Sequence, residues 1–535
     1  MSYWSALALA LAICFVNKAH AQPAPAVAPN ETPVQLPAFL VEEGKNTWYT
    51  AKAPGLEVLS LLPPDETREL VEAFLEARNT FDRLVPPAFQ GRSRDALTII
   101  LWDRSRKDTV PAETIAQYWP QDDSSGFRIE RLPNLLVTDL GACILFCTPP
   151  TSSISRGDHM RLTPQMVEYL LKTRQPALPR GMVPAFTKIY GDARSTDKSL
   201  QLHSVPWNWK LDRGENGFPL LAKLLDEKTT VTSETSERWQ SAWQIFVLWS
   251  LDPRFPERTS NFWHFMERCS AGEDSRTAFR ICYGTDCANL DDDLSRFLRK
   301  ARRDDFASEL DLSGIAPPVE IEVEKAGWRE VIRIKGNWLR LAAGCIKPDP
   351  GPLRSAYLDE ARKTVRNYLE KNGGDRDLLR LAGLIEADAG NAAAAEVLLN
   401  QAFSAGAADA LLGVTLSRLR MDRLGVATDA TSLSELLQPL VRCCENEIPP
   451  VEAVQLAVTI MGSAKVPPSL DELQQLARWA HFFPRRPTLL FAAAQILLHH
   501  DCKKEADELT RFALNNPLRP EGRQELEALL RRSNL

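Results

Sequence analysis

The pattern of apolar and polar residues predicts that the first part of the chain mixes helices and strands. Between residues 65 and 85, in "DETRELVEAFLEARNTFDRLV", apolar residues recur at the spacing of one helix face. The apolar run "ALTIILWD", residues 96–103, is typical of a buried strand. The stretch "FRIERLPNLLVTD", residues 127–139, is typical of two extended pieces separated near Pro133. A helix followed by strands and further helices indicates an α+β domain.

Three later stretches have the apolar period of helices and complete this part of the chain. They are Thr163–Thr173, Arg238–Asp252 and Leu290–Ala301. The first begins with Thr163 as a helix cap and proline at the first helical position, which is a strong start signal. On a helix the side chains of the acidic run Asp291–Asp293 would point in three directions. This pattern indicates a solvated helix face more than a metal site.

The second part of the chain has a different composition and predicts helices only. All but one of the 13 tryptophans precede residue 340. Beyond Pro348 the chain is rich in Ala, Leu and Arg and shows periodic segments of ordinary helix length, separated by short turns. Between the two parts, "GIAPPVEIEVEKAGW" is typical of a linker with a short strand.

One segment of the second part resembles a tetratricopeptide repeat. It is "LLRLAGLIEADAGNAAAAEVLLNQAFSAGA", residues 378–407, and residues 489–517 repeat its layout. That family places small residues where two helices cross closely, and the matching positions here are Gly383, Gly390, Ala395 and Ala402. Glu386 stands where the family usually has an aromatic residue. We expect about four to six TPR-like helical hairpins, with a helical domain without repeats as the alternative.

Composition and charge narrow the class of protein. The chain has 535 residues, of which 44% are hydrophobic and 25% are charged, as is usual for folded soluble proteins. Its formal net charge of −6 is spread over the whole length without a block rich in Lys and Arg. This distribution argues against a nucleic-acid partner.

The N-terminus has the pattern of a secretory signal peptide. The apolar run Ala6–Val16 is too short to span a bilayer comfortably, and the tripeptide "AHA" that ends at Ala21 matches a signal-peptidase site. The proline-rich stretch that follows predicts an extended tether. No other run approaches the length of a membrane span, so we expect an exported protein, periplasmic or extracellular, with no span in its mature form. The predicted organisation is a signal peptide at 1–21, a tether at 22–47, the α+β domain at 48–312, a linker at 313–349 and helical repeats at 350–535.

The stretch "LTPQMVEYLLKTRQPALPRGMVPAF", residues 162–186, resembles the peptidase core of gluzincin-type metallopeptidases. In that family one helix carries H-E-x-x-H, and a Leu-Pro segment leads into a second helix that supplies a glutamate. The two histidines and the later glutamate bind zinc, and the glutamate between the histidines takes a proton from the zinc-bound water. The resemblance implies a zincin-like fold for the α+β domain.

Every residue that performs this chemistry in the family is replaced here. Gln165 falls at the first histidine, Met166 at the catalytic glutamate and Tyr169 at the second histidine. Pro184 falls at the glutamate ligand. Glutamine and tyrosine are poor zinc ligands, and neither methionine nor proline acts as a general base. We therefore expect a pseudoenzyme with no catalytic residues, no metal and no cofactor.

These patterns together predict a non-catalytic binding or scaffold protein with a protein or peptide partner. Two alternatives stay open. One is a hydrolase with a relocated or non-zinc active site, built from Glu168, Asp158 or His159. The other is a purely structural protein of the cell envelope.

The signal-peptide prediction has a direct test. Mass spectrometry of the exported protein should find Gln22, with or without cyclisation to pyroglutamate, as the first residue, because cleavage follows the small residue at position 21. An exported form that retains Met1 would contradict the prediction.

Overall fold

The computed structural model describes residues 47–84, 97–101, 135–140, 143–147, 182–191, 194–195, 199–202, 221–225, 233–270, 274–303, 308–311, 321–345, 353–445, 449–483, 486–514 and 520–533. These residues belong to two compact units. The N-terminal unit contains those up to residue 136 and from 143 to 326. The helical unit contains residues 137–140 together with those from 327 onward.

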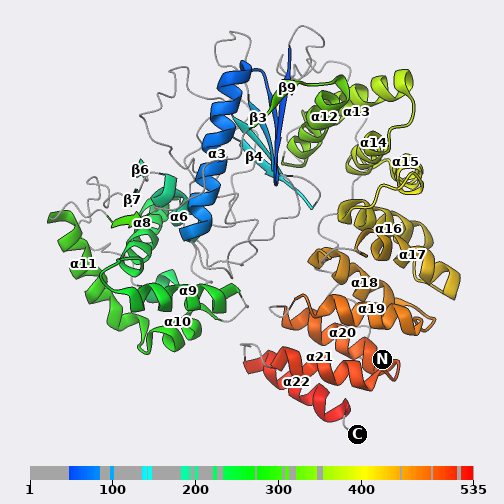
Figure 1. Cartoon of the computed structure of the whole chain (residues 1–535). Helices are drawn as coiled ribbons and strands as arrows, with labels where there is room; N and C mark the ends of the chain where they lie inside the picture. Colours follow the sequence, from blue (N-terminus) through cyan, green and yellow to red (C-terminus); the bar gives the residue numbers. More distant parts are fainter. Residues whose placement is uncertain are drawn as a thin grey trace. The chain divides into compact units, whose positions relative to one another are not determined.

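A six-stranded sheet organises the N-terminal unit (Figure 1). Its order is β4-β5-β3-β2-β1-β9. The three strands β2, β3 and β5 are parallel, whereas β1 is antiparallel to both β2 and β9. The bounds of the strands are β1 Tyr49–Ala53, β2 Leu56–Ser60, β3 Leu97–Leu101, β4 Leu135–Thr138, β5 Cys143–Cys147 and β9 Val323–Lys325.

The centre of the sheet confirms the strand expected at residues 96–103. All five residues of β3 are buried, as is usual for a parallel strand that is covered on both faces. Strand β4 confirms the second extended piece of residues 127–139, and the first piece lies outside the described residues. The helix expected between residues 65 and 85 is α3, Pro64–Leu84. It begins with a proline and two acidic residues, which suit a helix N-terminus.

The remaining elements of this unit are mainly helices. They are α6 Met182–Gly191, α7 Leu221–Leu224, α8 Ser233–Ser250, α9 Pro256–Ser270, α10 Ser275–Tyr283, the short 3₁₀ helix η2 Cys287–Leu290, and α11 Asp291–Arg303. A second, three-stranded sheet has the order β6-β7-β8, with bounds Arg194–Ser195, Ser199–Leu202 and Ser308–Asp311. Helices α8 and α11 confirm the two helices expected at Arg238–Asp252 and Leu290–Ala301.

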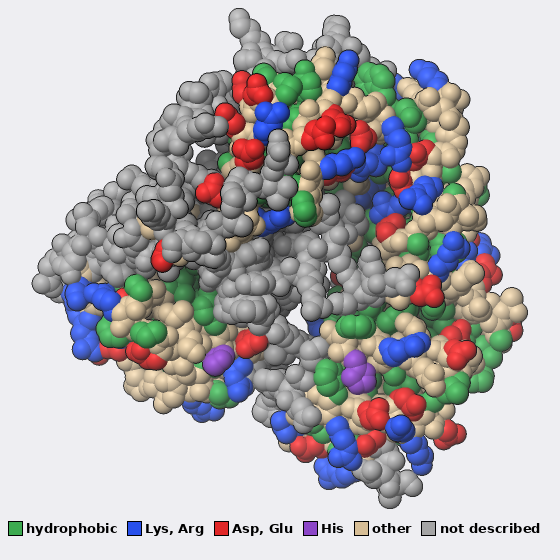
Figure 2. Space-filling view, in the orientation of Figure 1, with side chains coloured by type: hydrophobic (Ala, Val, Ile, Leu, Met, Phe, Trp, Pro, Cys, Tyr) green, Lys and Arg blue, Asp and Glu red, His purple; other side chains and the backbone are tan. Residues whose placement is uncertain are grey.

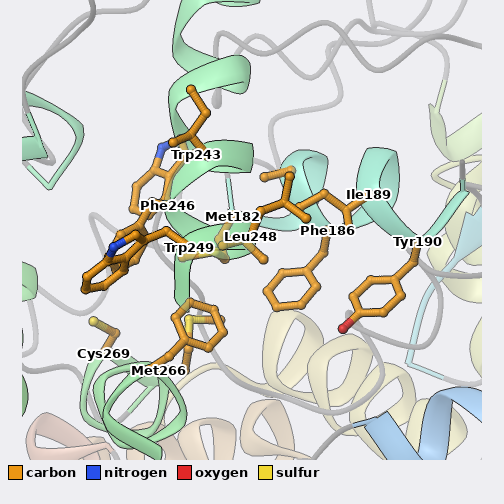
Figure 3. Packing of buried hydrophobic residues seen from close by; sticks show 14 of the residues in the cluster. Met182, Phe186, Ile189, Tyr190, Trp243, Phe246, Leu248, Trp249, Met266 and Cys269 are labelled. Carbon is orange, nitrogen blue, oxygen red and sulfur yellow. The ribbon is translucent and has the colours of Figure 1, made fainter. Parts of the chain in front are cut away.

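Aromatic side chains form much of the core among these helices. Phe246 of α8 is fully buried, and its ring lies 5.9 Å from that of Phe262 of α9 and 6.1 Å from that of Phe279 of α10. Helix α6 adds Phe186, whose ring lies 5.9 Å from that of Phe262. Figure 3 shows part of the same cluster, with Met182 and Phe186 of α6 and Phe246 and Trp249 of α8 labelled. Because buried aromatic rings contribute large apolar areas, this cluster is a main source of stability for the unit.

The helical unit contains eleven helices among the described residues. Their bounds are α12 Trp328–Cys345, α13 Leu353–Asn372, α14 Arg376–Asp388, α15 Ala392–Ser404, α16 Ala410–Leu424, α17 Ala430–Cys443, α18 Val451–Ser463, α19 Leu470–Ala480, α20 Pro487–His499, α21 Lys503–Leu514 and α22 Pro520–Ser533. Helices α12 to α21 form five consecutive pairs, each made of a helix and the next one along the chain, and α22 follows them. The expected fold class is thus confirmed in its coarse form, a mixed unit followed by an all-helical array. The zincin-like and TPR-like forms stay predictions.

The helix pairs stack so that two rows form. The inner row consists of α12, α14, α16, α18, α20 and α22, and each of these helices packs against the next in the row. The outer row consists of α13, α15, α17, α19 and α21, and within the described residues only α19 and α21 of this row pack against each other comparably. Successive helices stay in contact along the inner row and mostly lie farther apart along the outer row. The inner row is therefore the shorter of the two, and the array curves toward it (Figure 1).

The range 313–349 that was expected to be a linker is largely structured, which corrects the predicted boundary. The expected short strand is present as β9, but α12 follows at once and belongs to the helical unit, which begins at residue 327. Trp338 and Leu339 of α12 are buried. The prediction placed the boundary by composition, and this tryptophan-containing helix has the composition of the first part of the chain.

Glycines mark the closest crossings within three of the pairs. A Cβ atom at Gly383 of α14 would lie 2.7 Å from Cγ of Leu399 in α15. One at Gly413 of α16 would lie 2.8 Å from the backbone oxygen of Pro439 in α17, and one at Gly336 of α12 would lie 2.9 Å from Val365 in α13. These distances leave no room for a larger residue.

The four small residues singled out in the repeat have different roles. Gly383 lies at a close crossing, and Ala395 and Ala402 of α15 are fully buried, as the prediction required. Gly390 was wrongly assigned to a crossing. It lies in the turn between α14 and α15 with a φ of 82°, a left-handed conformation that favours glycine.

The crossing at Gly413 makes a prediction for stability. Gly413→Ala should lower the free energy of unfolding by about 1–3 kcal/mol, because the new methyl group meets the Pro439 backbone, which cannot move aside cheaply. Gly462→Ala in α18 is the matched control. Its Cβ atom would lie 3.7 Å from Ile496, so it should be neutral or stabilise by up to about 1 kcal/mol. Urea unfolding followed by circular dichroism measures both. Equal effects at the two positions would contradict the assignment.

Candidate functional site

Of the four peptidase-like motif positions, Pro184 lies in the described part of the chain. Gln165, Met166 and Tyr169 lie outside the described residues, as do the helix expected at Thr163–Thr173 and the residues of the alternative hydrolase site. Pro184 is the third residue of α6, within the first turn, where a helix tolerates proline; its side chain is not described.

The described residues contain no cluster of three or more His, Cys, Asp or Glu side chains arranged to hold a metal ion. The acidic run at the start of α11 has other contacts. Asp291 accepts a hydrogen bond of 2.7 Å from the backbone N–H of Leu221, and Asp293 pairs with Arg296 one turn later. Burial raises the pKa of Asp291, while the bond from Leu221 partly offsets this effect.

Among the described residues, no helix is both long and apolar enough to cross a membrane.

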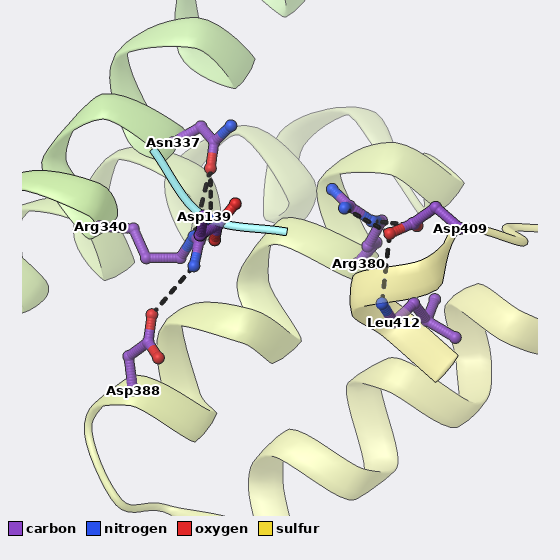
Figure 4. A network of polar contacts seen from close by, with 7 residues as sticks. All are labelled: Asp139, Asn337, Arg340, Arg380, Asp388, Asp409 and Leu412. Carbon is purple, nitrogen blue, oxygen red and sulfur yellow. Dashed lines mark hydrogen bonds and ion pairs between the residues drawn. The ribbon is translucent and has the colours of Figure 1, made fainter. Parts of the chain in front are cut away.

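A buried arginine in the helical unit binds a short extended segment of the chain (Figure 4). The side chain of Arg340 in α12 is only 5% exposed. It pairs with Asp139, which directly follows strand β4, and with Asp388 of α14 at 3.1 Å. It also donates a hydrogen bond of 3.0 Å to Asn337. Burial alone would lower the pKa of Arg340, but the two carboxylates outweigh it, so the guanidinium stays charged.

Two other arginines tie successive helices of the inner row to one another. Arg329 of α12 pairs with Asp375, the residue that caps the N-terminus of α14. Arg380 of α14 pairs in the same way with Asp409, the cap of α16, and Figure 4 shows this contact. Each cap carboxylate accepts backbone N–H bonds and an arginine at once. The contacts therefore fix the start of one helix against its neighbour.

Glu386, the residue that departs from the repeat family, has partners that explain it. Its side chain is 8% exposed and accepts two bonds from Arg362 of α13, at 2.6 and 3.1 Å. Asn391 donates a third bond of 2.6 Å. Burial alone would raise the pKa of Glu386, but these bonds outweigh it and hold the pKa below its ordinary value of 4.5. A charged pair thus occupies this position between α13 and α14.

The inner row presents a stripe of mainly polar side chains on three successive helices. We define the inner stripe by residues on one face of α16, α18 and α20, spaced three or four apart and half-buried or exposed: Thr415, Arg418, Asp422, Glu452, Gln455, Thr459, Phe491 and Gln495. The opposite faces of these helices are buried against the array. Arg418, Thr459 and Gln495 stand at equal distances from the N-cap residues of their helices, so the stripe repeats from helix to helix.

Several groups of the inner stripe are available for a ligand. The side-chain amides of Gln455 and Gln495 have no hydrogen-bond partner within the described part of the chain, and Arg418 has no ion pair there. Elsewhere in the unit, several arginines, among them Arg329, Arg362, Arg380 and Arg423, are paired with carboxylates, and Figure 2 shows Lys and Arg interspersed with Asp and Glu over these helices. The inner stripe therefore combines free amides with one free cation and is the candidate binding site.

Sequence reasoning did not find the inner stripe, although its spacing was visible. Thr415, Arg418 and Asp422 recur at the helix period, as do Glu452, Gln455 and Thr459. The same period describes any solvated helix face. Only the stacking of α16, α18 and α20 shows that these faces share one side of the array.

Removal of the Glu386 charge is expected to lower the stability of the protein by an amount that depends on pH. Glu386→Gln should lower the free energy of unfolding by about 1.5–3 kcal/mol at neutral pH, because it removes the charge from hydrogen bonds that Arg362 makes in a buried site. The pKa of Glu386 is lower in the folded chain than in the unfolded chain. Its contribution is therefore complete well above pH 4.5 and is lost as the pH falls through the folded-state value.

Asp359→Asn is the matched control, since Asp359 pairs with the same arginine but is 66% exposed. It should cost about 0–1 kcal/mol. Chemical unfolding at neutral pH and at decreasing pH measures both variants. The difference between wild type and Glu386→Gln should shrink in acid, and a difference that is independent of pH would contradict the assigned role.

Comparison with protein-family models, with curated proteins and with solved structures finds no match to this chain. The chemistry of the described side chains is therefore the basis for assigning a function.

Proposed function

We propose that this chain is an exported, non-catalytic binding or scaffold protein that holds a polypeptide partner along the inner stripe of its helical unit. One observation carries the proposal. Three stacked helices present Arg418, Gln455 and Gln495, whose side chains have no hydrogen-bond or ion-pair partner among the described residues, on the side toward which the array curves. A curved stack of helix pairs offers a long continuous surface, which suits an elongated ligand better than a small molecule.

The N-terminal unit is proposed to be a pseudoenzyme with a degenerate zincin-like fold. The support is the replacement of every zinc ligand and of the general base in the resemblance, at Gln165, Met166, Tyr169 and Pro184. A mixed sheet followed by helices is compatible with this proposal. Export rests on the signal-peptide pattern at residues 1–21.

Site-specific photo-crosslinking in the producing cell tests the binding proposal. A benzophenone amino acid would replace Gln455 of α18, in the inner stripe, or Gln438 of α17, an exposed glutamine of the outer row. The full chain should form discrete crosslinked species from position 455 and few or none from position 438. The reason is that the reactive group must lie within a few ångströms of the partner.

Three outcomes would contradict the proposal. Crosslinks at both positions, with the same products, would indicate collisions without a defined site. Crosslinks at neither position would indicate that the inner stripe has no partner. Digestion of casein by the purified full chain, abolished by a chelator, would instead favour a hydrolase.

A further inference from the structure

We infer that residues 137–140 form a strap that the helical unit holds more tightly when the Asp388 side chain is neutral than when it is charged. Two carboxylates share the guanidinium of Arg340, and only one of them, Asp139, belongs to the strap. A proton on the other carboxylate is therefore the signal that fastens this segment of the chain.

The strap is anchored to the helical unit at two adjacent residues. Asp139 pairs with Arg340 of α12, and the next residue, Leu140, packs against the apolar cluster built from α16 and later helices. The strap continues from strand β4, and strand β5 begins soon after it, at Cys143. Opening of the strap must therefore break both an ion pair and an apolar contact.

One buried guanidinium holds carboxylates from two different segments (Figure 4). Arg340 is 5% exposed and pairs with Asp388 of α14 at 3.1 Å as well as with Asp139. It also donates two bonds to Asn337, a neutral side chain, at 3.0 and 3.2 Å. The three charged side chains together carry a net charge of −1, so the two carboxylates repel each other beside one cation.

The charge of Asp388 favours the open strap for two reasons. In the closed state this charge repels Asp139 and shares the guanidinium with it. In the open state Asp388 stays with Arg340, so the arginine is not left without a carboxylate, which would be costly in a buried place. When Asp388 is neutral, Asp139 is the one charged carboxylate that pairs with Arg340 among the described residues.

The pKa of Asp388 shows the same coupling from the other side. Burial raises this pKa above its ordinary value of 3.8, Arg340 lowers it, and the charge of Asp139 raises it. Arg354 of α13, which donates a bond of 3.0 Å to the backbone oxygen of Asp388, also lowers it. Linkage is reciprocal: because the charge of Asp139 favours a proton on Asp388, that proton in turn favours the closed strap. A fall in pH from neutral toward the pKa of Asp388 should therefore tighten the strap.

Thiol labelling at position 140 measures how often the strap opens in the full chain. Leu140→Cys places a thiol on the strap, and a bulky maleimide should reach it when the side chain leaves the apolar cluster. The labelling rate at this position, read by mass spectrometry of its peptide, then follows the open population. The buried cysteines Cys443 and Cys444 are internal references, since they should react when the helical unit unfolds.

Three further changes in this background separate the roles of the carboxylates. Asp139→Asn should speed labelling about 10-fold or more, as expected for loss of a hydrogen bond between charged groups. Asp388→Asn should slow labelling about 3-fold or more, because it removes the competing charge. Asp377→Asn is the matched control. It removes a carboxylate of similar exposure, 39% against 40%, from Arg329 of the same helix α12, and it should leave the rate unchanged.

Lower pH should remove the difference between the Asp388→Asn chain and its parent. At neutral pH the parent should label faster. The ratio of the two rates should approach one as Asp388 takes up its proton, because the parent then has the same charge at this position as the variant. Taking the ratio cancels the effect of pH on the maleimide reaction itself.

The inference is overturned if Asp388→Asn labels position 140 as fast as the parent chain or faster, since the second carboxylate would then support the strap. It is also overturned if Asp139→Asn leaves the rate unchanged. Equal rates at position 140 and at the reference cysteines would show that the strap does not open separately from the helical unit. A rate ratio that stays constant as the pH falls would contradict the role of the proton.

Discussion

In each of the first three helix pairs of the helical unit, a glycine in the inner-row helix lies directly against the outer-row helix. Gly336, Gly383 and Gly413 allow this approach because a Cβ atom at any of them would come within 3 Å of the partner helix. Because the two helices of each such pair lie close together, the pair stacks on the next one as a compact unit. This stacking produces the two rows of helices and the curvature of the array. The inner stripe lies on α16, α18 and α20, the inner-row helices of the third, fourth and fifth pairs, and it shares one side of the array because these helices stack on one another.

Arginine–carboxylate contacts determine how one pair follows the next. Arg329 and Arg380 reach cap residues of the following inner-row helices, and Arg340 adds a buried pair to Asp388. Apolar packing alone has little directional preference, whereas a cap carboxylate that also accepts an arginine fixes both position and orientation. Burial of these charges is tolerated because every one of them is paired. Arg418 differs from them in having no ion pair among the described residues.

The stability of the N-terminal unit depends mainly on apolar packing. Its parallel strands β2, β3 and β5 are apolar, and its helices meet in the aromatic cluster around Phe246. This cluster of buried rings supplies the apolar area that a compact core requires.

The sequence by itself determined the elements whose signal is local. Strand β3, helices α3, α8 and α11, and the change to an all-helical second part follow from apolar period and composition. The close crossing at Gly383 was also predictable, since the repeat pattern marks it. Tertiary structure decided the remaining contacts, because these contacts depend on which segments of the chain meet. The pairing of Glu386 with Arg362, the pairing of Arg340 with Asp139, and the matching positions of Arg418, Thr459 and Gln495 on stacked helices relate residues from different segments of the chain. Single-helix periodicity specifies which face of a helix is polar, but only packing specifies what that face opposes.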